Sequence, residues 1–139
     1  MNLEGKHIIV TGGGSGVGAQ TARQFVEAGA DVTIMGRTEQ SLLDQNIPYQ
    51  VCDVTDREMV MKAFDAARSA RGPVAVVVAN AGAATSVPFA KLTPETLNDM
   101  LSVNLSGVIN CWQAALPDMK SAGWGRMIAT ASTASLRGY

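Results

Sequence analysis

The sequence predicts an α/β fold in which a doubly wound parallel sheet is covered by helices on both faces. Three observations carry this prediction: strand-like runs alternate with helical patterns five times, the runs are almost continuously apolar, and a glycine-rich turn follows the first run. Strands that are covered on both faces lose the alternation of apolar and polar residues, because neither face meets water. Repeated alternation of strands and helices favours parallel pairing through right-handed crossovers.

The five predicted strands are short and rich in apolar residues. They read HIIV, DVTIMG, YQVCDV, VAVVVAN and GRMIATAS, at residues 7–10, 31–36, 49–54, 74–80 and 125–132. We expect each of them to be buried on both faces of the sheet. His7, the one histidine of the chain, is expected just before the first strand and Tyr49 at the start of the third, both in structural roles.

The stretch TGGGSGVG, residues 11–18, is expected to turn the chain from the first strand into the first helix. Its composition alone also suits a flexible linker, since glycine and serine dominate such tethers. The neighbours favour the turn, because an apolar run precedes the stretch and small and apolar residues recur at helical spacing after it. That helical face is predicted to contain Val17, Ala22, Phe25, Val26 and Gly29.

A second helix is predicted at residues 56–70. It follows Thr55, and Glu58 lies three positions further on, which is the spacing of a capping box. In that motif each side chain can bond the backbone N–H of the other residue. Between the second and third strands, residues 38–48 fit either a short helix or an irregular connection.

A long helix is predicted after Thr93, which is suited to cap it. Pro94 takes the first helical position, where its missing N–H costs nothing, and the helix is expected to end near residues 117–123. This helix has more apolar surface than contact with one sheet explains, so we expect another chain to cover part of it. The residues concerned are Leu97, Leu101, Val108 and Trp112.

Length and composition limit what the chain does. Its 139 residues, 47% of them hydrophobic and 17% charged, suffice for one domain over residues 1–139. A formal net charge of -1 without a basic run predicts no nucleic-acid partner. No signal peptide and no membrane-spanning stretch are evident, so we expect a cytoplasmic protein. Cys52 and Cys111 are expected to be buried core side chains, not disulfide or metal ligands.

The glycine-rich turn suits the binding of a phosphate. A helix that begins directly after a buried strand points its unpaired backbone N–H groups, and the positive end of its dipole, at the carboxyl edge of the sheet. Glycines leave room there for a pyrophosphate and for close packing of the helix on the strand. The expected ligand-binding residues of the turn are Gly12, Gly14, Ser15, Gly16, Val17 and Gly18.

Further motifs follow the pattern Thr-Gly-x-x-x-Gly-x-Gly in order: CDVTD at residues 52–56, ANAG at 79–82, VNLSG at 103–107 and ATAS at 129–132. With them, the chain resembles the short-chain dehydrogenase/reductase family in its compact form, from residue 3 to residue 139. The resemblance implies a Rossmann-like three-layer α/β/α fold, incomplete at its carboxyl-terminal side, that binds a nicotinamide dinucleotide. It also implies hydride transfer between the nicotinamide and a small-molecule carbonyl or alcohol substrate.

The resemblance assigns residues after the third and fourth strands to the cofactor. Asp53, followed by Val54, matches the acidic position that accepts a hydrogen bond from the adenine amino group. A carboxylate that caps the next helix is the alternative interpretation. Asn80, Ala81 and Gly82 match the Asn-Ala-Gly signature, which lies beside the cofactor and ties the central sheet together.

The end of the second predicted strand favours NADP over NAD. Dinucleotide folds that use NAD place a carboxylate there to accept hydrogen bonds from the ribose hydroxyls, and Gly36 stands at that position. The guanidinium of Arg37 suits the additional phosphate of NADP, although a solvated loop charge is the alternative. Ser15 replaces a basic residue that the family often uses for NADP, so NAD stays open as cofactor. The missing carboxylate also argues against a methyltransferase.

The resemblance assigns the chemistry to Ser132, which orients the substrate oxygen, and to Asn104, which holds a water in a proton relay. Ser135 is the weaker alternative to Ser132, and an asparagine in a helix is also typical of a local hydrogen-bonded kink. The family's proton donor is the tyrosine of a Tyr-x-x-x-Lys motif, which residues 1–139 lack. Tyr139 stands too close to Ser132 for the family's spacing and has no lysine after it.

Two hypotheses therefore remain for the chain. It is either the amino-terminal part of an oxidoreductase or a short protein that binds a dinucleotide without turnover, as a sensor does. Residues 1–139 alone are expected to be inactive as a dehydrogenase, because the phenol and the lysine are missing. The family also uses its long helix in assembly, which implies a homo-oligomer, either a dimer or a tetramer.

Overall fold

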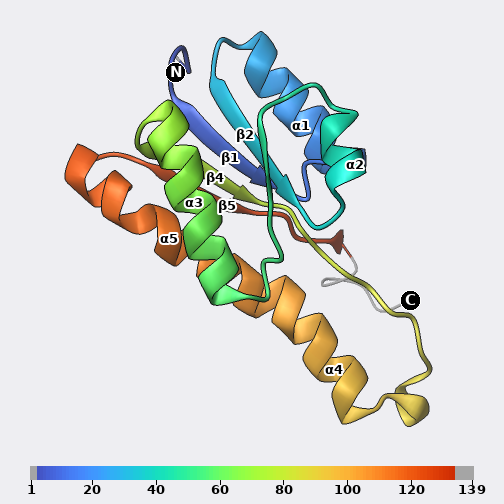
Figure 1. Cartoon of the computed structure of the whole chain (residues 1–139). Coiled ribbons are helices and arrows are strands. Elements are labelled where there is room, and N and C mark those ends of the chain that lie inside the picture. Colours follow the sequence, from blue (N-terminus) through green and yellow to red (C-terminus); the bar gives the residue numbers. More distant parts are fainter. Residues whose placement is uncertain (1–2, 134–139) are drawn as a thin grey trace.

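The computed structural model describes residues 3–133, which form a parallel sheet of five strands in the order β3-β2-β1-β4-β5 (Figure 1). All four neighbouring pairs of strands run parallel. The chain steps outward from β1 to β3 and then returns to the other side of β1, so the predicted doubly wound α/β fold is confirmed. The strands are β1 (His7–Thr11), β2 (Asp31–Gly36), β3 (Tyr49–Val51), β4 (Val74–Ala79) and β5 (Arg126–Ala129).

Helices lie on both faces of the sheet, with α1 and α2 on one face and α3 and α5 on the other (Figure 1). The helix α4 runs into α5 through a π-helical segment, η2, and extends beyond the sheet. No helix within residues 3–133 is long and apolar enough to cross a membrane. The helical elements are α1 (Gly16–Glu27), α2 (Glu39–Leu43), α3 (Arg57–Arg71), the 3-10 turn η1 (Phe89–Lys91), α4 (Pro94–Leu101), η2 (Ser102–Ser106) and α5 (Gly107–Ala122).

Each face of the sheet has its own apolar core, because successive residues of a strand point to opposite sides. On β1, Ile9 packs with Phe64 and the other buried side chains of α3 and α5. Ile8 and Val10 point the other way and pack with buried side chains of α1 and α2. Burial of one such side chain contributes about 1.5–3 kcal/mol. The two cores together fix the strands whose carboxyl ends form the candidate site.

Three predicted strands, the third, fourth and fifth, are shorter than expected, and the two edge strands are more exposed, since β3 is only half-buried. The third ends at Val51, so Cys52 belongs to the connection after it. The fifth ends at Ala129, and the prediction that it is buried on both faces is wrong, because Ile128 is 44% exposed. Within residues 3–133, β5 pairs with β4 alone and forms the edge of the sheet, which leaves its other side open.

Of the two predicted helix caps, the one at α4 is confirmed and the one at α3 is wrong. Thr93 caps α4 through its side chain and Pro94 is the first helical residue, as expected. The capping box at α3 is wrong, because the cap is Asp56, whose carboxylate accepts from the backbone N–H of Met59 at 3.0 Å. The hydroxyl of Thr55 donates instead to a carboxylate in the preceding connection.

The face that α1 presents to the sheet consists of small residues. Gly18, Ala19 and Ala22 are buried there, whereas Val17 is 70% exposed and Val26 is 46% exposed. The predicted helical face therefore includes two residues that do not pack on the sheet and a third, Gly29, that lies beyond the end of α1. Close approach of the helix to β1 leaves space only for small side chains, which apolar spacing does not reveal. The connection at residues 38–48 begins with the short helix α2, one of the two alternatives.

Cys52 and Cys111 are free thiols in the core of the α3 and α5 face, as predicted. Burial raises the pKa of Cys52 to about 11 and that of Cys111 to about 12. Both therefore stay protonated at neutral pH and pack as small apolar side chains.

His7 was expected just before the first strand, but it is the first residue of β1, and it is buried. Its Nδ1 donates to the carbonyl oxygen of Gly72 at 2.8 Å, so its Nε2 accepts from the hydroxyl of Thr33 at 3.0 Å. This pair of bonds suits the neutral imidazole. Burial lowers the pKa of His7, and the hydrogen bond to Gly72 offsets only part of that effect.

We expect the stability of the chain to fall as the pH drops below about 6.5, the ordinary pKa of histidine. Below that pH the unfolded chain binds a proton at His7 that the folded chain does not, and the free energy of unfolding decreases until the pH reaches the lowered pKa. Urea unfolding at pH 7.5 and 5.5 measures the loss. The free energy of unfolding of a His7→Gln variant should decrease less between these two pH values. Equal decreases in the two proteins would show that His7 does not cause the loss.

Candidate functional site

A groove runs along the carboxyl edge of the sheet, where the strand order reverses between β1 and β4. Its central part is lined by the ends of β1, β2 and β4 and by the connection after β3. Two adjoining hollows share lining residues with it, one next to α2 and one next to α4. We call the three together the carboxyl-edge groove. Ligands of doubly wound sheets bind at such a reversal of strand order.

The glycine turn forms the floor of this groove next to β1. Gly12 has φ +65°, and a Cβ there would lie 3.0 Å from Cα of Ala81. Gly18 packs still more closely, since a Cβ would lie 2.3 Å from the carbonyl oxygen of Gly12. Gly16, with φ +53°, has nothing within 4 Å of its Cβ position. Two glycines therefore permit contact within the protein, and the third leaves open space at the start of α1.

The helix α1 begins at this turn with backbone N–H groups that no side chain caps. Its N-cap, Ser15, makes no capping hydrogen bond through its hydroxyl, and its first turn contains no acidic residue. The N-terminus of a helix in this state favours an anion, because unpaired N–H groups and the helix dipole both attract negative charge. Gly14 and Ser15, which stand just before α1 in this turn, line the hollow next to α2.

Asn80 joins the ends of the central strands. Its backbone N–H and that of Ala81 both donate to the hydroxyl of Thr11, at 3.1 and 3.0 Å. Its Nδ2 donates to the carbonyl oxygen of Thr11 at 3.2 Å, and its Oδ1 accepts from the hydroxyl of Thr130 at 3.1 Å. One side chain thus holds β1, β4 and the segment after β5 together next to the groove, which Asn80 itself does not line.

Asp53 lies in the groove wall after β3. Its Oδ1 accepts from the backbone N–H and the hydroxyl of Thr55, at 2.9 and 2.8 Å. Partial burial raises the pKa of Asp53, but these hydrogen bonds and the charge of Arg37 outweigh it and leave the pKa below its usual value. The carboxylate is therefore ionised at neutral pH. It caps no helix, because Asp56 caps α3.

Arg37 follows β2 and lines all three parts of the groove. It is exposed and forms no salt bridge within 4 Å among residues 3–133. Thr38 and Ser41 stand beside it in the hollow next to α2. A guanidinium that forms no salt bridge within the described part of the chain, close to two hydroxyl-bearing residues, suits a phosphate.

The two predicted catalytic residues lie beside the groove and do not line it. Asn104 stands in η2, where its Oδ1 accepts from the backbone N–H of Ala83 at 3.1 Å and its Nδ2 donates to the carbonyl of Ala83 at 2.7 Å. It thereby holds the segment after β4 against the long helix. Ser132 is exposed, three residues after the end of β5 and at the same edge of the sheet. Ser135 and Tyr139 lie outside the described residues.

The fold adds residues that line or adjoin the groove and that sequence reasoning missed. Thr11 accepts two backbone hydrogen bonds at the floor, and Val103 lines the wall formed by the long helix. Thr38 and Ser41 line the hollow next to α2. Thr11 belongs to the glycine motif, so its position was a usable signal. The others come from segments whose contact with the groove depends on the three-dimensional fold.

Comparison with known proteins finds relatives along the whole chain. A family model described as short chain dehydrogenase matches residues 6–139. The oxidoreductase asL5 of Sarocladium schorii is 36% identical over 99% of this chain and 58% of its own length. The NADP-dependent (R)-specific alcohol dehydrogenase of Lentilactobacillus kefiri is 38% identical over 99% of this chain and 57% of its own.

A solved structure matches the fold closely. The crystal structure of gox2181 superposes with a TM-score of 0.95 at 26% sequence identity, over 99% of this chain and 58% of the other. The chain thus spans a little more than half the length of the relatives that it matches.

Proposed function

Because the chain belongs to the short-chain dehydrogenase family, we propose that it supplies the NADP-binding part of an oxidoreductase that transfers a hydride between nicotinamide and a carbonyl or alcohol carbon. The observation that carries the proposal is the carboxyl-edge groove, which brings the glycine turn, Arg37 and Asp53 together from three connections. A relative named as an NADP-dependent alcohol dehydrogenase supports the choice of cofactor.

The residues of the groove fit a dinucleotide phosphate. At Gly12 a side chain would collide with the segment after β4, and at Gly16 the space in front of the helix is open. Uncapped N–H groups at the start of α1 suit the pyrophosphate, and the ionised carboxylate of Asp53 suits the adenine amino group. When it is bound, the cofactor supplies the hydride.

We propose NADP as the preferred cofactor because of what stands after β2. Gly36 offers no carboxylate to repel a 2′-phosphate, and the guanidinium of Arg37 faces the groove without a salt-bridge partner among residues 3–133. NAD remains the alternative, since Ser15 brings no second positive charge to the glycine turn.

For the chemical step we propose that Ser132 orients the substrate oxygen and that Asn104 supports the proton relay. Residues 1–139 contain no Tyr-x-x-x-Lys motif. A polypeptide of these residues alone should therefore bind NADP(H) without turnover, because the alkoxide left by hydride transfer needs a positioned proton donor. A dinucleotide-binding sensor without turnover is the alternative function. A cytoplasmic location stays a prediction from the sequence.

We also propose that the protein forms a homo-oligomer through its long helix. Five large apolar side chains of this helix are between 41% and 54% exposed, and four of them recur every four residues, so they share one face of the helix. Leu97 and Leu101 were predicted to belong to this surface, whereas Val108 and Trp112 are half-buried. The exposed side chains are Leu97, Leu101, Leu105, Ile109 and Leu116.

Replacement of Ser132 by alanine tests the proposed chemistry in the full-length protein. We expect kcat for carbonyl reduction to fall by about 100-fold, as for loss of one hydrogen-bond donor at a reacting oxygen. The affinity for NADPH should stay unchanged, because the groove does not include this residue. Loss of NADPH absorbance with a panel of ketones and aldehydes gives kcat. A variant with normal turnover, or one that loses cofactor affinity equally, would contradict this role.

A further inference from the structure

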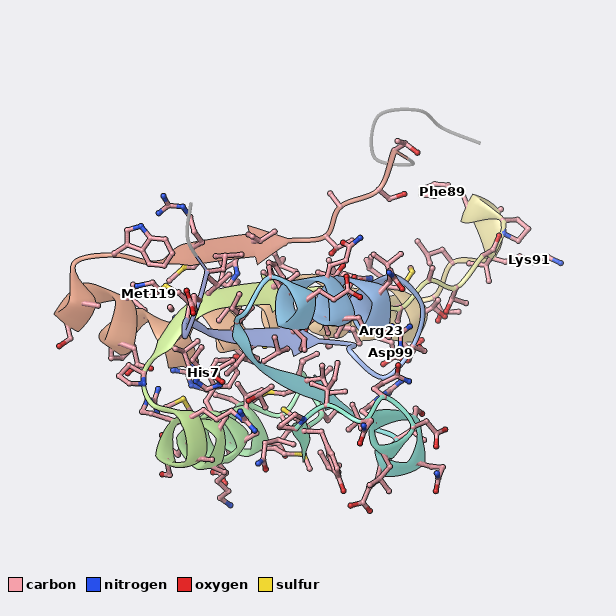
Figure 2. The ribbon with its side chains drawn as sticks, turned by 90° about the horizontal axis from the view of Figure 1, so that it is seen from above. His7, Arg23, Phe89, Lys91, Asp99 and Met119 are labelled. Carbon is pink, nitrogen blue, oxygen red and sulfur yellow. The ribbon has the colours of Figure 1, made fainter. Side chains whose placement is uncertain are left out.

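The side chain of Gln45 joins the glycine turn to α2. Its Nε2 donates to the carbonyl oxygens of Gly14, at 2.9 Å, and Ser41, at 3.0 Å. Its Oε1 accepts from Nη1 of Arg23 in α1, at 2.6 Å. Figure 2 labels Arg23 on α1, on the side from which it reaches the turn after α2. Three segments of the chain are thus connected through one amide group.

The chemistry of the partners fixes the orientation of this amide. A carbonyl oxygen only accepts hydrogen bonds, and a guanidinium only donates them. A flipped amide would therefore lose all three bonds. Both hydrogens of Nε2 are used, one on each carbonyl, which leaves a glutamate or a methionine at position 45 unable to replace them. The connection requires an amide at this site.

The bonds act on the part of the groove next to α2. Gly14 and Ser41 both line that hollow, together with Arg37. The turn and the helix are in close contact, because a Cβ on Gly14 would lie 3.1 Å from Cβ of Ser41. On the other side, the backbone N–H of Gly13 donates to the carbonyl of Met35 at 3.2 Å. The turn is therefore held both by β2 and by Gln45.

A held carbonyl also sets the direction of the next amide. In a planar trans peptide, the C=O and N–H bonds point in opposite directions. The carbonyl of Gly14 points at Gln45, so the N–H of Ser15, in the same peptide group, points away from Gln45. Ser15 itself lines the hollow next to α2.

We propose that Gln45 is a positioning residue of the phosphate site: it holds the Gly14 carbonyl so that the N–H of Ser15 faces a phosphate of the bound dinucleotide. The inference rests on the proposed function and adds a residue that acts without contact with the ligand. Arg23 orients the amide and has the same indirect role. The arrangement gives the glycine turn one shape before the cofactor binds, which lowers the cost of ordering it.

The test compares Gln45→Met with Gln40→Met in the full-length protein. Gln40 is a matched control, because it belongs to α2 and its Nε2 donates to Asp44, away from the turn. The probes are NADPH and adenosine, which has the base and ribose without phosphate. We expect Gln45→Met to lower the affinity for NADPH about 10-fold, which is the effect of one hydrogen bond to a charged group. The affinity for adenosine should stay unchanged. Gln40→Met should change neither.

The outcomes separate this inference from the proposed function. Wild-type protein that does not bind NADPH would overturn the proposed function and, with it, the role of Gln45. Wild-type binding with unchanged affinity in Gln45→Met would overturn the role of Gln45 alone. Equal losses for NADPH and adenosine would also overturn it, since general loosening of the fold weakens both probes.

A second variant covers the case in which Gln45→Met does not fold. Gln45→Glu keeps an acceptor for Arg23 but sets a carboxylate against two carbonyl oxygens. It should lower the affinity for NADPH more than Gln45→Met does, again without an effect on the affinity for adenosine. Unchanged NADPH affinity in this variant would count against the proposal as directly as in the first.

Discussion

Alanine at position 18 should lower the free energy of unfolding by about 3 kcal/mol, at the upper end of the usual range for an overpacked site. The new Cβ would lie 2.3 Å from the carbonyl oxygen of Gly12 and 2.5 Å from Nδ2 of Asn80. The first is a backbone atom, so α1 or the glycine turn must move. At an unhindered helical position the same change would stabilise the protein by about 1 kcal/mol, which makes the sign of the effect informative.

Urea unfolding of Gly18→Ala measures this effect, and titration with NADPH measures its consequence for the site. We expect no saturable binding, because the movement displaces the N–H groups at the start of α1. Gly16→Ala serves as the control for stability alone, since Gly16 belongs to the proposed cofactor site. Its Cβ meets nothing within 4 Å, and it should lose only the roughly 1 kcal/mol of strain that φ +53° imposes. Wild-type stability in Gly18→Ala would show that α1 does not pack on the turn as described.

Glutamate at position 37 should reverse the preference between the two cofactors. It removes the positive charge that we propose for the 2′-phosphate and adds a negative charge in its place. We expect NADPH binding to weaken by about 1–3 kcal/mol, from the lost charge-assisted bond and the new repulsion. NADH should bind as well as before or better, because a carboxylate after the second strand accepts hydrogen bonds from the ribose hydroxyls.

Calorimetric titrations with NADPH and NADH at two salt concentrations test this prediction. The preference of the wild type for NADPH should shrink at high salt, because Arg37 is exposed and its attraction is screened. Lys62→Glu makes the same change of charge on the exposed surface of α3 and should leave both affinities unchanged. Equal losses for both cofactors in Arg37→Glu would show that this side chain does not read the phosphate.

The order of strands and helices was predictable because local signals and burial agree along most of the chain. DVTIMG matches β2 to the residue, and Pro94 begins α4 as expected. The prediction fails for β5, whose apolar sequence suggests burial although Ile128 is 44% exposed in the described residues. An apolar pattern indicates that a strand can be buried. It does not indicate whether another segment of the chain packs against it.

The candidate site was predictable where the motif spacing carries it. The glycine turn, Arg37 and Asp53 each follow a recognisable strand, and the parallel sheet brings the ends of those strands to one edge. Gln45 could not be found in this way, because its bonds reach Gly14, 31 positions away, and Arg23, 22 positions away. Neither propensity nor spacing indicates a contact of this kind. The polar residues that support a site without touching its ligand are the ones that need the fold.

Direct titration of the purified protein with NADPH and NADH tests the central claim, that the carboxyl-edge groove binds a dinucleotide and prefers NADP. The account predicts saturable binding of one NADPH per chain, about 10-fold or more tighter than NADH at low salt, with the difference removed in Arg37→Ala. Absence of saturable binding to either cofactor would contradict the claim. Equal affinities for NADPH and NADH, unchanged in Arg37→Ala, would also contradict it.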